Sequence, residues 1–158
     1  MIHFPYQVEK FSNPSSQLVP VGKAGRLRPL LPIRLFGPTG RFHRYRPAVA
    51  DTGSVDSLFP SLAATVLRVN LQPTTSQSTN WRGSQFPLRF GRVEMELSSA
   101  TEIYRWSAVV GFTSAPLPYP LLGLTGFFEY FDATFRGADH ELELTPVRTF
   151  PGSIKVVP

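Results

Sequence analysis

Cysteine is absent from the sequence, which excludes disulfides, thiolate metal sites, iron–sulfur clusters and a cysteine nucleophile. Long helices are not expected either, because 16 prolines and 12 glycines are spread along the 158 residues and proline breaks a helix. Charged residues make up only 17% of the chain, whereas apolar residues make up 42%. This apolar content is enough for one core, so the sequence predicts a single folded domain of mainly β structure.

Signals for export or membrane insertion are also lacking. Residues 1–10 do not combine a basic start with an apolar run, so no secretory signal is expected. The longest uncharged stretch, residues 106–128, contains Pro116, Pro118 and Pro120, and these prolines would break a membrane-spanning helix. We therefore expect a cytoplasmic protein with no membrane partner.

Acidic residues are missing from residues 11–50, although the chain as a whole has a net charge of +5 and a pI near 10.0. The basic residues of this segment are Lys23, Arg26, Arg28, Arg34, Arg41, Arg44 and Arg46. Clustered positive charge is one way to bind RNA or DNA, so a nucleic-acid partner stays open as an alternative. No known binding motif accompanies the charge, and we favour a solvated strand face.

Clusters of turn-forming residues divide the chain into short elements. Residues 1–24, with three prolines and a serine-rich patch, are expected to form an extended N-terminal arm outside the core of a domain that spans residues 25–158. Polar residues 72–80 are expected to form a solvent loop. The patterns predict a helix at 61–67, a helical turn at 126–131, hairpins at 27–36 with 42–50, 92–97 with 103–112 and 133–135 with 141–144, and a strand at 154–157.

The segment Asp51-Thr52-Gly53-Ser54 directly follows a short apolar strand and is the strongest local signal for chemistry. Taken alone, it is typical of an ordinary Asx turn, in which the carboxylate caps nearby backbone amides. About 70 residues later, Leu121-Leu122-Gly123 is followed by Gly126 and two phenylalanines. A predicted helix, a polar stretch and a hairpin lie between the two segments. Together they resemble the two signatures of retropepsin-like (retroviral-type) aspartic proteases, in a prokaryotic single-domain form, over roughly residues 26–146.

The resemblance implies an all-β fold, the retropepsin-like acid-protease barrel, and an aspartic endopeptidase that cleaves extended peptide segments without a cofactor. Such an enzyme needs two carboxylates that share one proton and activate a water. The chain contains one Asp-Thr-Gly, so a homodimer would have to bring the Asp51 of each subunit together. In the family's pattern Thr52 would hydrogen-bond across the two-fold axis, Gly53 would let the substrate backbone approach, and Ser54 would hydrogen-bond the carboxylate.

The resemblance also gives structural roles to Leu121, Leu122 and Gly123, which would pack beneath the catalytic turn. The position after them is Leu124, where retroviral members often carry an arginine, so the ion pair that stabilises their dimers is not expected here. The chain-terminal strand at 154–157 is the predicted contributor to the dimer, since unpaired strand edges recruit partners.

Retropepsin-like enzymes close a hairpin flap over the substrate, and residues 72–91 occupy the corresponding place in this chain. Trp81 and Gly83 are the candidate flap residues. The alternative for Trp81 is a core tryptophan anchored at the surface.

Other kinds of site have little support in the sequence. His3, His43 and His140 are far apart along the chain, so no metal site is predicted. No Gly-x-Ser-x-Gly nucleophile elbow and no phosphate-binding loop occur. Besides the protease, two alternatives stay open: a noncatalytic peptide-binding module on the same fold, and a basic β module that binds nucleic acid.

Overall fold

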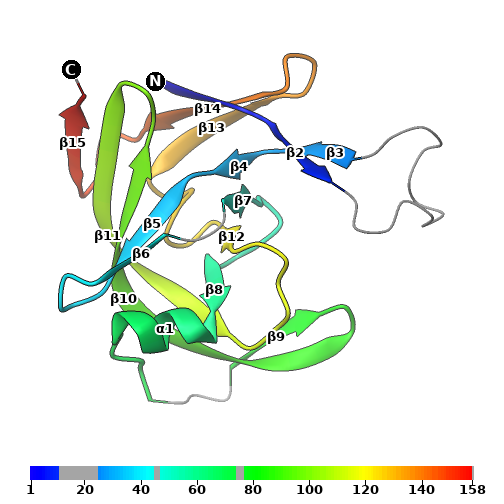
Figure 1. Cartoon of the computed structure of the whole chain (residues 1–158), viewed down its shortest axis with the longest axis vertical. Helices are drawn as coiled ribbons and strands as arrows, with labels where there is room; N and C mark the ends of the chain where they lie inside the picture. The colour runs from blue at the N-terminus through cyan, green and yellow to red at the C-terminus, as the bar shows by residue number, and fades with distance from the viewer. Residues whose placement is uncertain (11–24, 45–46, 74–76, 158) are drawn as a thin grey trace.

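The computed structural model describes residues 1–10, 25–44, 47–73 and 77–157 (Figure 1). Over these residues the chain is mainly β, with one short helix, and this confirms the predicted fold class at the level of secondary structure. The elements are β1 (Ile2–Pro5), β2 (Gln7–Lys10), β3 (Gly25–Arg28), β4 (Leu30–Leu31), β5 (Ile33–Phe36), β6 (Phe42–Arg44), β7 (Ala48–Ala50), β8 (Leu58–Pro60), α1 (Ser61–Leu67), β9 (Ser78–Trp81), β10 (Ser84–Ser98), β11 (Glu102–Thr113), β12 (Leu121–Leu122), β13 (Phe131–Arg136), β14 (Glu141–Pro146) and β15 (Ser153–Val156).

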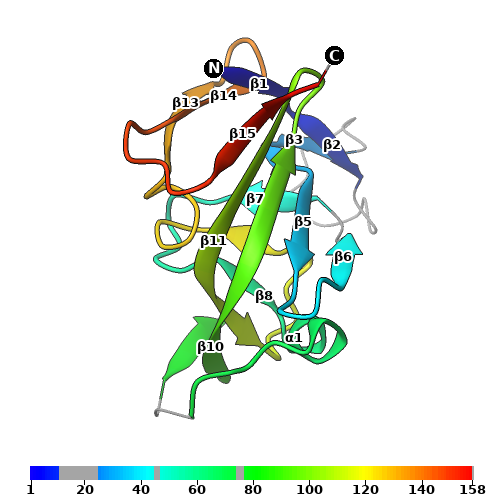
Figure 2. The ribbon, with the colours of Figure 1, turned by 90° about the vertical axis from the view of Figure 1, so that its left-hand side faces the viewer.

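The long hairpin of β10 and β11 is the backbone of the largest sheet, whose order is β4-β7-β12-β8-β11-β10-β5-β6. Its register runs from Leu88 opposite Thr113 to Ser98 opposite Ile103, so the hairpin predicted from residues 92–97 and 103–112 is confirmed. Figure 2 shows the two strands running along the length of the molecule. Val93 and Met95 point into the core while Glu94 between them is exposed, as the period of two in a half-buried strand requires.

Aromatic side chains fill the part of the core beside β13. The Trp106 ring meets Phe131 edge-to-face at 5.3 Å between centroids and contacts Phe127 at 6.1 Å. Trp106 Nε1 also donates a hydrogen bond of 3.0 Å to the carbonyl of Gly126. Residues 126–130 form hydrogen-bonded turns without a regular helix, and Phe131, the last residue of the predicted helical turn, belongs to β13. Gly126 has a φ of +89°, a left-handed backbone angle that does not continue a right-handed helix.

The N-terminal strand is part of the core, so the prediction that residues 1–24 lie outside it is wrong for β1. Ile2 and Phe4 are 3% and 8% exposed, and they lie opposite Leu144 and Leu142 in the pairing of β1 with β14. Alternation of apolar and polar residues over residues 2–5 gives the strand one buried face. Residues 11–24 of the predicted arm lie outside the described residues.

The remaining local predictions mostly agree with the structure. Helix α1 has the predicted bounds, and strands occupy the predicted closing hairpin and the predicted strand near residue 154. The predicted solvent loop is wrong in part, because Ser78–Trp81 forms β9 and pairs with the start of β10. In the part of the chain that is described, no helix has both the length and the apolar character needed to cross a membrane.

Candidate functional site

The Asp51 turn begins where the buried strand β7 ends. The backbone N–H of Asp51 donates to the carbonyl of Leu122 at 3.0 Å, and the N–H of Ala50 donates to the carbonyl of Pro29 at 3.0 Å. The Asp51 Oδ1 atom accepts a hydrogen bond of 3.0 Å from the N–H of Gly53, which is the Asx-turn geometry. The start of the turn is therefore held by β12 and by Pro29, which lies between β3 and β4, while the side chain of Asp51 remains partly exposed.

The second predicted signature lies directly against this turn. In β12, Leu121 and Leu122 pair in parallel with Val49 and Ala50 of β7. Gly123 then passes so close to the turn that a Cβ atom would lie 2.4 Å from the Asp56 carbonyl oxygen, so only glycine fits there. Two segments about 70 residues apart in the sequence are thus interlocked through their backbones.

A buried serine that sequence reasoning missed strengthens this interlock. The Ser57 hydroxyl donates to the carbonyl of Thr125 at 2.8 Å and accepts from the N–H of Gly123 at 3.1 Å. It is fully buried, and its bond to the Gly123 N–H is shielded from water. The only signal in the sequence was a hydroxyl residue just before the apolar strand β8.

The predicted role of Ser54 differs from the observed one. Its hydroxyl donates to the carbonyl of Asp56 at 2.7 Å instead of to the Asp51 carboxylate. Ser54 therefore shapes the turn, and the carboxylate takes its hydrogen bond from the Gly53 N–H. Thr52 and Gly53 are exposed at the tip of the turn.

A pocket of ≈ 380 Å³ lies between the Asp51 turn and the β9–β10 hairpin. Asp51 and the candidate flap residue Trp81 both line it, and Leu58, Leu88 and Leu121 supply apolar walls; the other lining residues are Gly53, Ser54, Val55, Asp56, Ser78, Thr79 and Asn80. Leu121 thus contributes to the pocket as well as to the interlock, whereas Leu122 is fully buried beneath the turn.

The β9–β10 hairpin has a tight two-residue turn. Arg82 and Gly83 both have positive φ, at 51° and 82°, which matches the type I′ geometry favoured between twisted strands. The Asn80 Oδ1 atom accepts a hydrogen bond of 3.1 Å from the Gly83 N–H and fixes the turn. Gly83 therefore serves the hairpin turn, and Trp81 is a half-buried wall of the pocket and not a core residue.

Asp56 is a second carboxyl group that sequence reasoning did not single out. It lines the pocket with Asp51 and also an adjoining pocket of ≈ 450 Å³, in which Gln72, Gln77 and Phe90 take part. Burial raises the pKa of Asp56 above its ordinary value. The two pockets share the lining residues Asp56, Ser78 and Leu88, so they adjoin along the hairpin, and we call the two together the groove.

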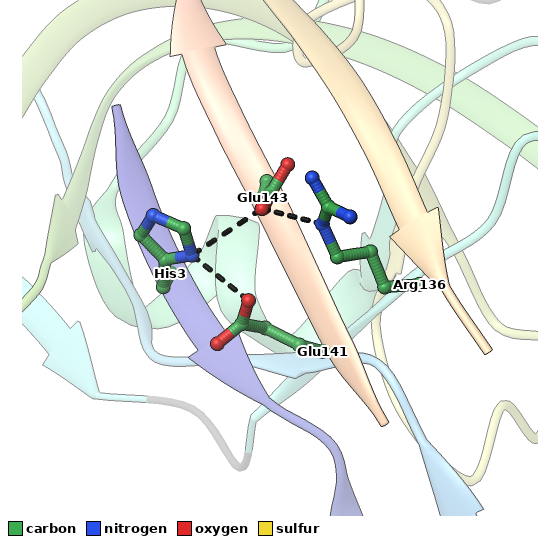
Figure 3. A network of polar contacts seen from close by, with 4 residues as sticks. All are labelled: His3, Arg136, Glu141 and Glu143. Atoms are coloured by element: carbon green, nitrogen blue, oxygen red, sulfur yellow. Dashed lines mark hydrogen bonds and ion pairs between the residues drawn. The ribbon is translucent and has the colours of Figure 1, made fainter. Parts of the chain in front are cut away.

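His3 is not isolated in space, although it is in the sequence. Pairing of β1 with β14 places its Nδ1 atom 2.9 Å from Glu141 Oε1 and 3.7 Å from Glu143 Oε1 (Figure 3). Among the described residues these three could together approach a metal ion. Arg136 already binds Glu143, however, and this hydrogen bond lowers the pKa of the Glu143 carboxyl. The group is a network of polar contacts that ties β1, β13 and β14 together.

Several arginines of the basic segment face glutamates from elsewhere in the fold. Arg26 Nε lies 2.6 Å from Glu9 Oε2, and Arg34 donates to Glu96 Oε1 at 3.3 Å. These pairs offset part of the positive charge of the segment. They agree with the favoured interpretation, in which the basic residues lie on a solvated strand face. Lys23 and Arg46 lie outside the described residues.

The structure thus brings Asp51, Leu121 and Trp81 around one groove, places Leu122 and Gly123 beneath the Asp51 turn, and leaves Gly83 at the far turn of the hairpin. A single chain offers this groove one Asp-Thr-Gly carboxylate. Comparison of the chain with protein-family models, with curated proteins and with solved structures found no match.

Proposed function

We propose that the protein is a retropepsin-like aspartic endopeptidase, built on that family's barrel, which acts as a homodimer. The observation that carries the proposal is the interlock of the two signatures. The Asp51 N–H is bonded to Leu122, and Gly123 packs against the carbonyl of Asp56 at a distance that excludes any other residue. An ordinary Asx turn needs no such partner segment, so the interlock favours the protease over the turn alone.

The proposed chemistry uses the Asp51 carboxylates of both subunits. Two carboxylates in close contact cannot both ionise cheaply, so they share one proton and hold a water between them. One carboxylate acts as the general base that activates this water, and its protonated partner donates a hydrogen bond to the scissile carbonyl oxygen. The pKa values that govern cleavage then describe the two coupled carboxyl groups together and not either group alone.

The substrate of this proposal is an extended peptide in the groove beneath the β9–β10 hairpin. Leu58, Leu88 and Leu121 line the groove, so aliphatic or aromatic substrate side chains fit next to the scissile bond. A hairpin that lies over the groove can hold an extended peptide through backbone hydrogen bonds. Trp81 is the flap residue that would cover the substrate.

Replacement of the candidate catalytic residue tests the proposal. Asp51→Asn is expected to lower peptide cleavage by roughly three orders of magnitude or more while the fold is kept, because an amide cannot act as the base. The measurement is digestion of a random peptide library, read by mass spectrometry, with Asp132→Asn as the control because Asp132 is an exposed carboxylate on β13. Wild-type cleavage is expected to be fastest in mildly acidic solution.

Other results would contradict the proposal. Cleavage that survives in Asp51→Asn, or a rate that rises continuously to about pH 9, does not agree with a carboxylate pair. Peptide binding without any cleavage by the wild type would favour the noncatalytic peptide-binding module. Strongly salt-dependent retention on a nucleic-acid column, with no peptide binding, would favour the basic module.

A further inference from the structure

A separate pocket of ≈ 480 Å³ lies on the solvent-facing side of the β10–β11 hairpin. Its walls come from β10 and β11, from the turn between β5 and β6, and from Asn70, which follows α1. In the described part of the chain it shares no lining residue with the groove, so the proposed function does not use it. Its volume falls within the range of about 300–1,000 Å³ that is usual for small-molecule sites.

Close backbone packing fixes the walls of this pocket. A Cβ atom on Gly37 would collide with the carbonyl of Leu67, so the β5–β6 turn packs directly against the end of α1. Figure 2 shows this turn next to the helix. On the other side, Leu71 forms a β-bridge with Gly91 of β10 and so holds the preceding residue, Asn70, beside the hairpin. The pocket is therefore preformed, as small-molecule sites usually are.

Arg92 brings a positive charge to the pocket that no acidic side chain balances directly. Over the described ranges, no carboxylate lies within ion-pair distance of its guanidinium group. Arg92 Nη1 donates a hydrogen bond of 3.2 Å to Ser107 Oγ, which leaves other N–H groups of the guanidinium available. The Ser107 oxygen accepts this bond, so its own O–H can donate to a ligand.

The opposite wall of the pocket is a neutralised ion pair on an aromatic ring. Arg105 Nε donates to Glu94 Oε2 at 2.8 Å, so these two charges offset each other. The Arg105 guanidinium also lies over the Phe36 ring, at 4.1 Å from its centroid. With this pair matched, the charge of Arg92 is the one that remains uncompensated in the lining of the pocket.

We propose that this pocket binds a small molecule in which one carboxylate group is joined to an aromatic body. The carboxylate accepts hydrogen bonds from Arg92 and Ser107, which lie side by side, and Asn70 supplies a further amide donor. The aromatic body packs against the Phe36 ring. A single negative charge is favoured, because the Glu94 carboxylate in the same pocket repels a second one.

An NMR titration with benzoate tests the proposal. Benzoate is expected to cause saturable shifts of the amide signals of residues 36–40, 92–94 and 105–107, and benzamide, its uncharged counterpart, is expected to bind more weakly. Arg92→Gln is expected to weaken benzoate binding at least about tenfold, because a hydrogen-bonded charge is lost. Ser107→Ala is expected to weaken it as well. Amide signals outside the pocket report whether each variant keeps the fold.

Arg89→Gln is the matched control. Arg89 is an exposed arginine of β10, three positions before Arg92 and therefore on the opposite face of the strand, and it does not line the pocket. This variant is expected to bind benzoate as the wild type does. Asp51→Asn is also expected to bind it normally, so the result does not depend on the proposed protease.

Four results would overturn the proposed site. They are the absence of shifts at these residues in millimolar benzoate, equal affinity for benzoate and benzamide, an equal loss of binding in Arg89→Gln and Arg92→Gln, and tighter binding of phenyl phosphate than of benzoate. The last result would show that the pocket selects a doubly charged group. Benzoate binding that depends on Arg92 supports the site even if the protein cleaves no peptide.

Discussion

Asp56 shows how burial of one carboxyl group links the site to stability. Its half-buried position in the groove disfavours the charged form and raises its pKa above the ordinary value of 3.8. The folded state therefore binds this proton more tightly than the unfolded state does. The stabilising contribution of protonated Asp56 is complete below pH 3.8 and is lost as the pH rises through the folded-state pKa.

Asp56→Asn is therefore expected to raise the midpoint of thermal unfolding at pH 7, because the amide has no charge to bury. The gain is expected to shrink as the pH is lowered toward 3.8. Calorimetry at several pH values measures it, with Asp132→Asn on the exposed face of β13 as the control. An equal gain at all pH values, or none at pH 7, would contradict desolvation as the cause.

At the scale of elements, β1 has a larger role than its position near the chain end suggests. Its two buried residues contribute to the same core as Trp106 and Phe131. Between them, His3 joins the network with Glu141 and Glu143 on the opposite face (Figure 3). One short strand thus contributes to the core on one face and to a polar network on the other.

Truncation of these side chains is expected to destabilise the protein. Ile2→Ala and Phe4→Ala should each lower the free energy of unfolding by about 2–4 kcal/mol, from lost burial and the cavity left behind. Denaturant unfolding measures the change, and Leu62→Ala is the exposed control, expected within about 0.5 kcal/mol of the wild type. If Ile2→Ala and Phe4→Ala unfold at the wild-type denaturant concentration, β1 does not belong to the core in solution.

At the scale of the whole molecule, the proposed activity depends on assembly. One Asp-Thr-Gly per chain makes one half of the proposed site, and in the proposed dimer a second chain supplies the other half. Dimer formation and substrate binding are therefore expected to influence each other.

Cleavage per subunit is accordingly expected to fall on dilution. When monomer dominates, mass action makes the total rate rise about with the square of the protein concentration. Hydrolysis of a fluorogenic peptide and sedimentation, measured over the same dilution series, test this. If activity per subunit stays constant at concentrations where sedimentation detects only monomer, one chain must contain a complete site.

The sequence by itself determined the features that depend on neighbouring residues. Alternation over residues 92–97 predicted the core of β10, and apolar spacing after Pro60 predicted α1 with its observed bounds. The Asp51 turn was also predictable, since an Asx turn is made by the residues of the turn itself. Such patterns are local because side-chain direction repeats every 2 residues in a strand and about every 3.6 in a helix.

Only the tertiary structure decided which distant segments meet. It buried Ile2 against β14, brought His3 to Glu141, and placed Ser57 between Thr125 and Gly123. Asp56 gained its raised pKa from burial in a groove that two separate segments create. A single sequence carries no local pattern for such contacts, because each partner by itself reads as an ordinary strand or turn residue. The pairing is settled by which arrangement buries the apolar faces and satisfies the buried backbone together.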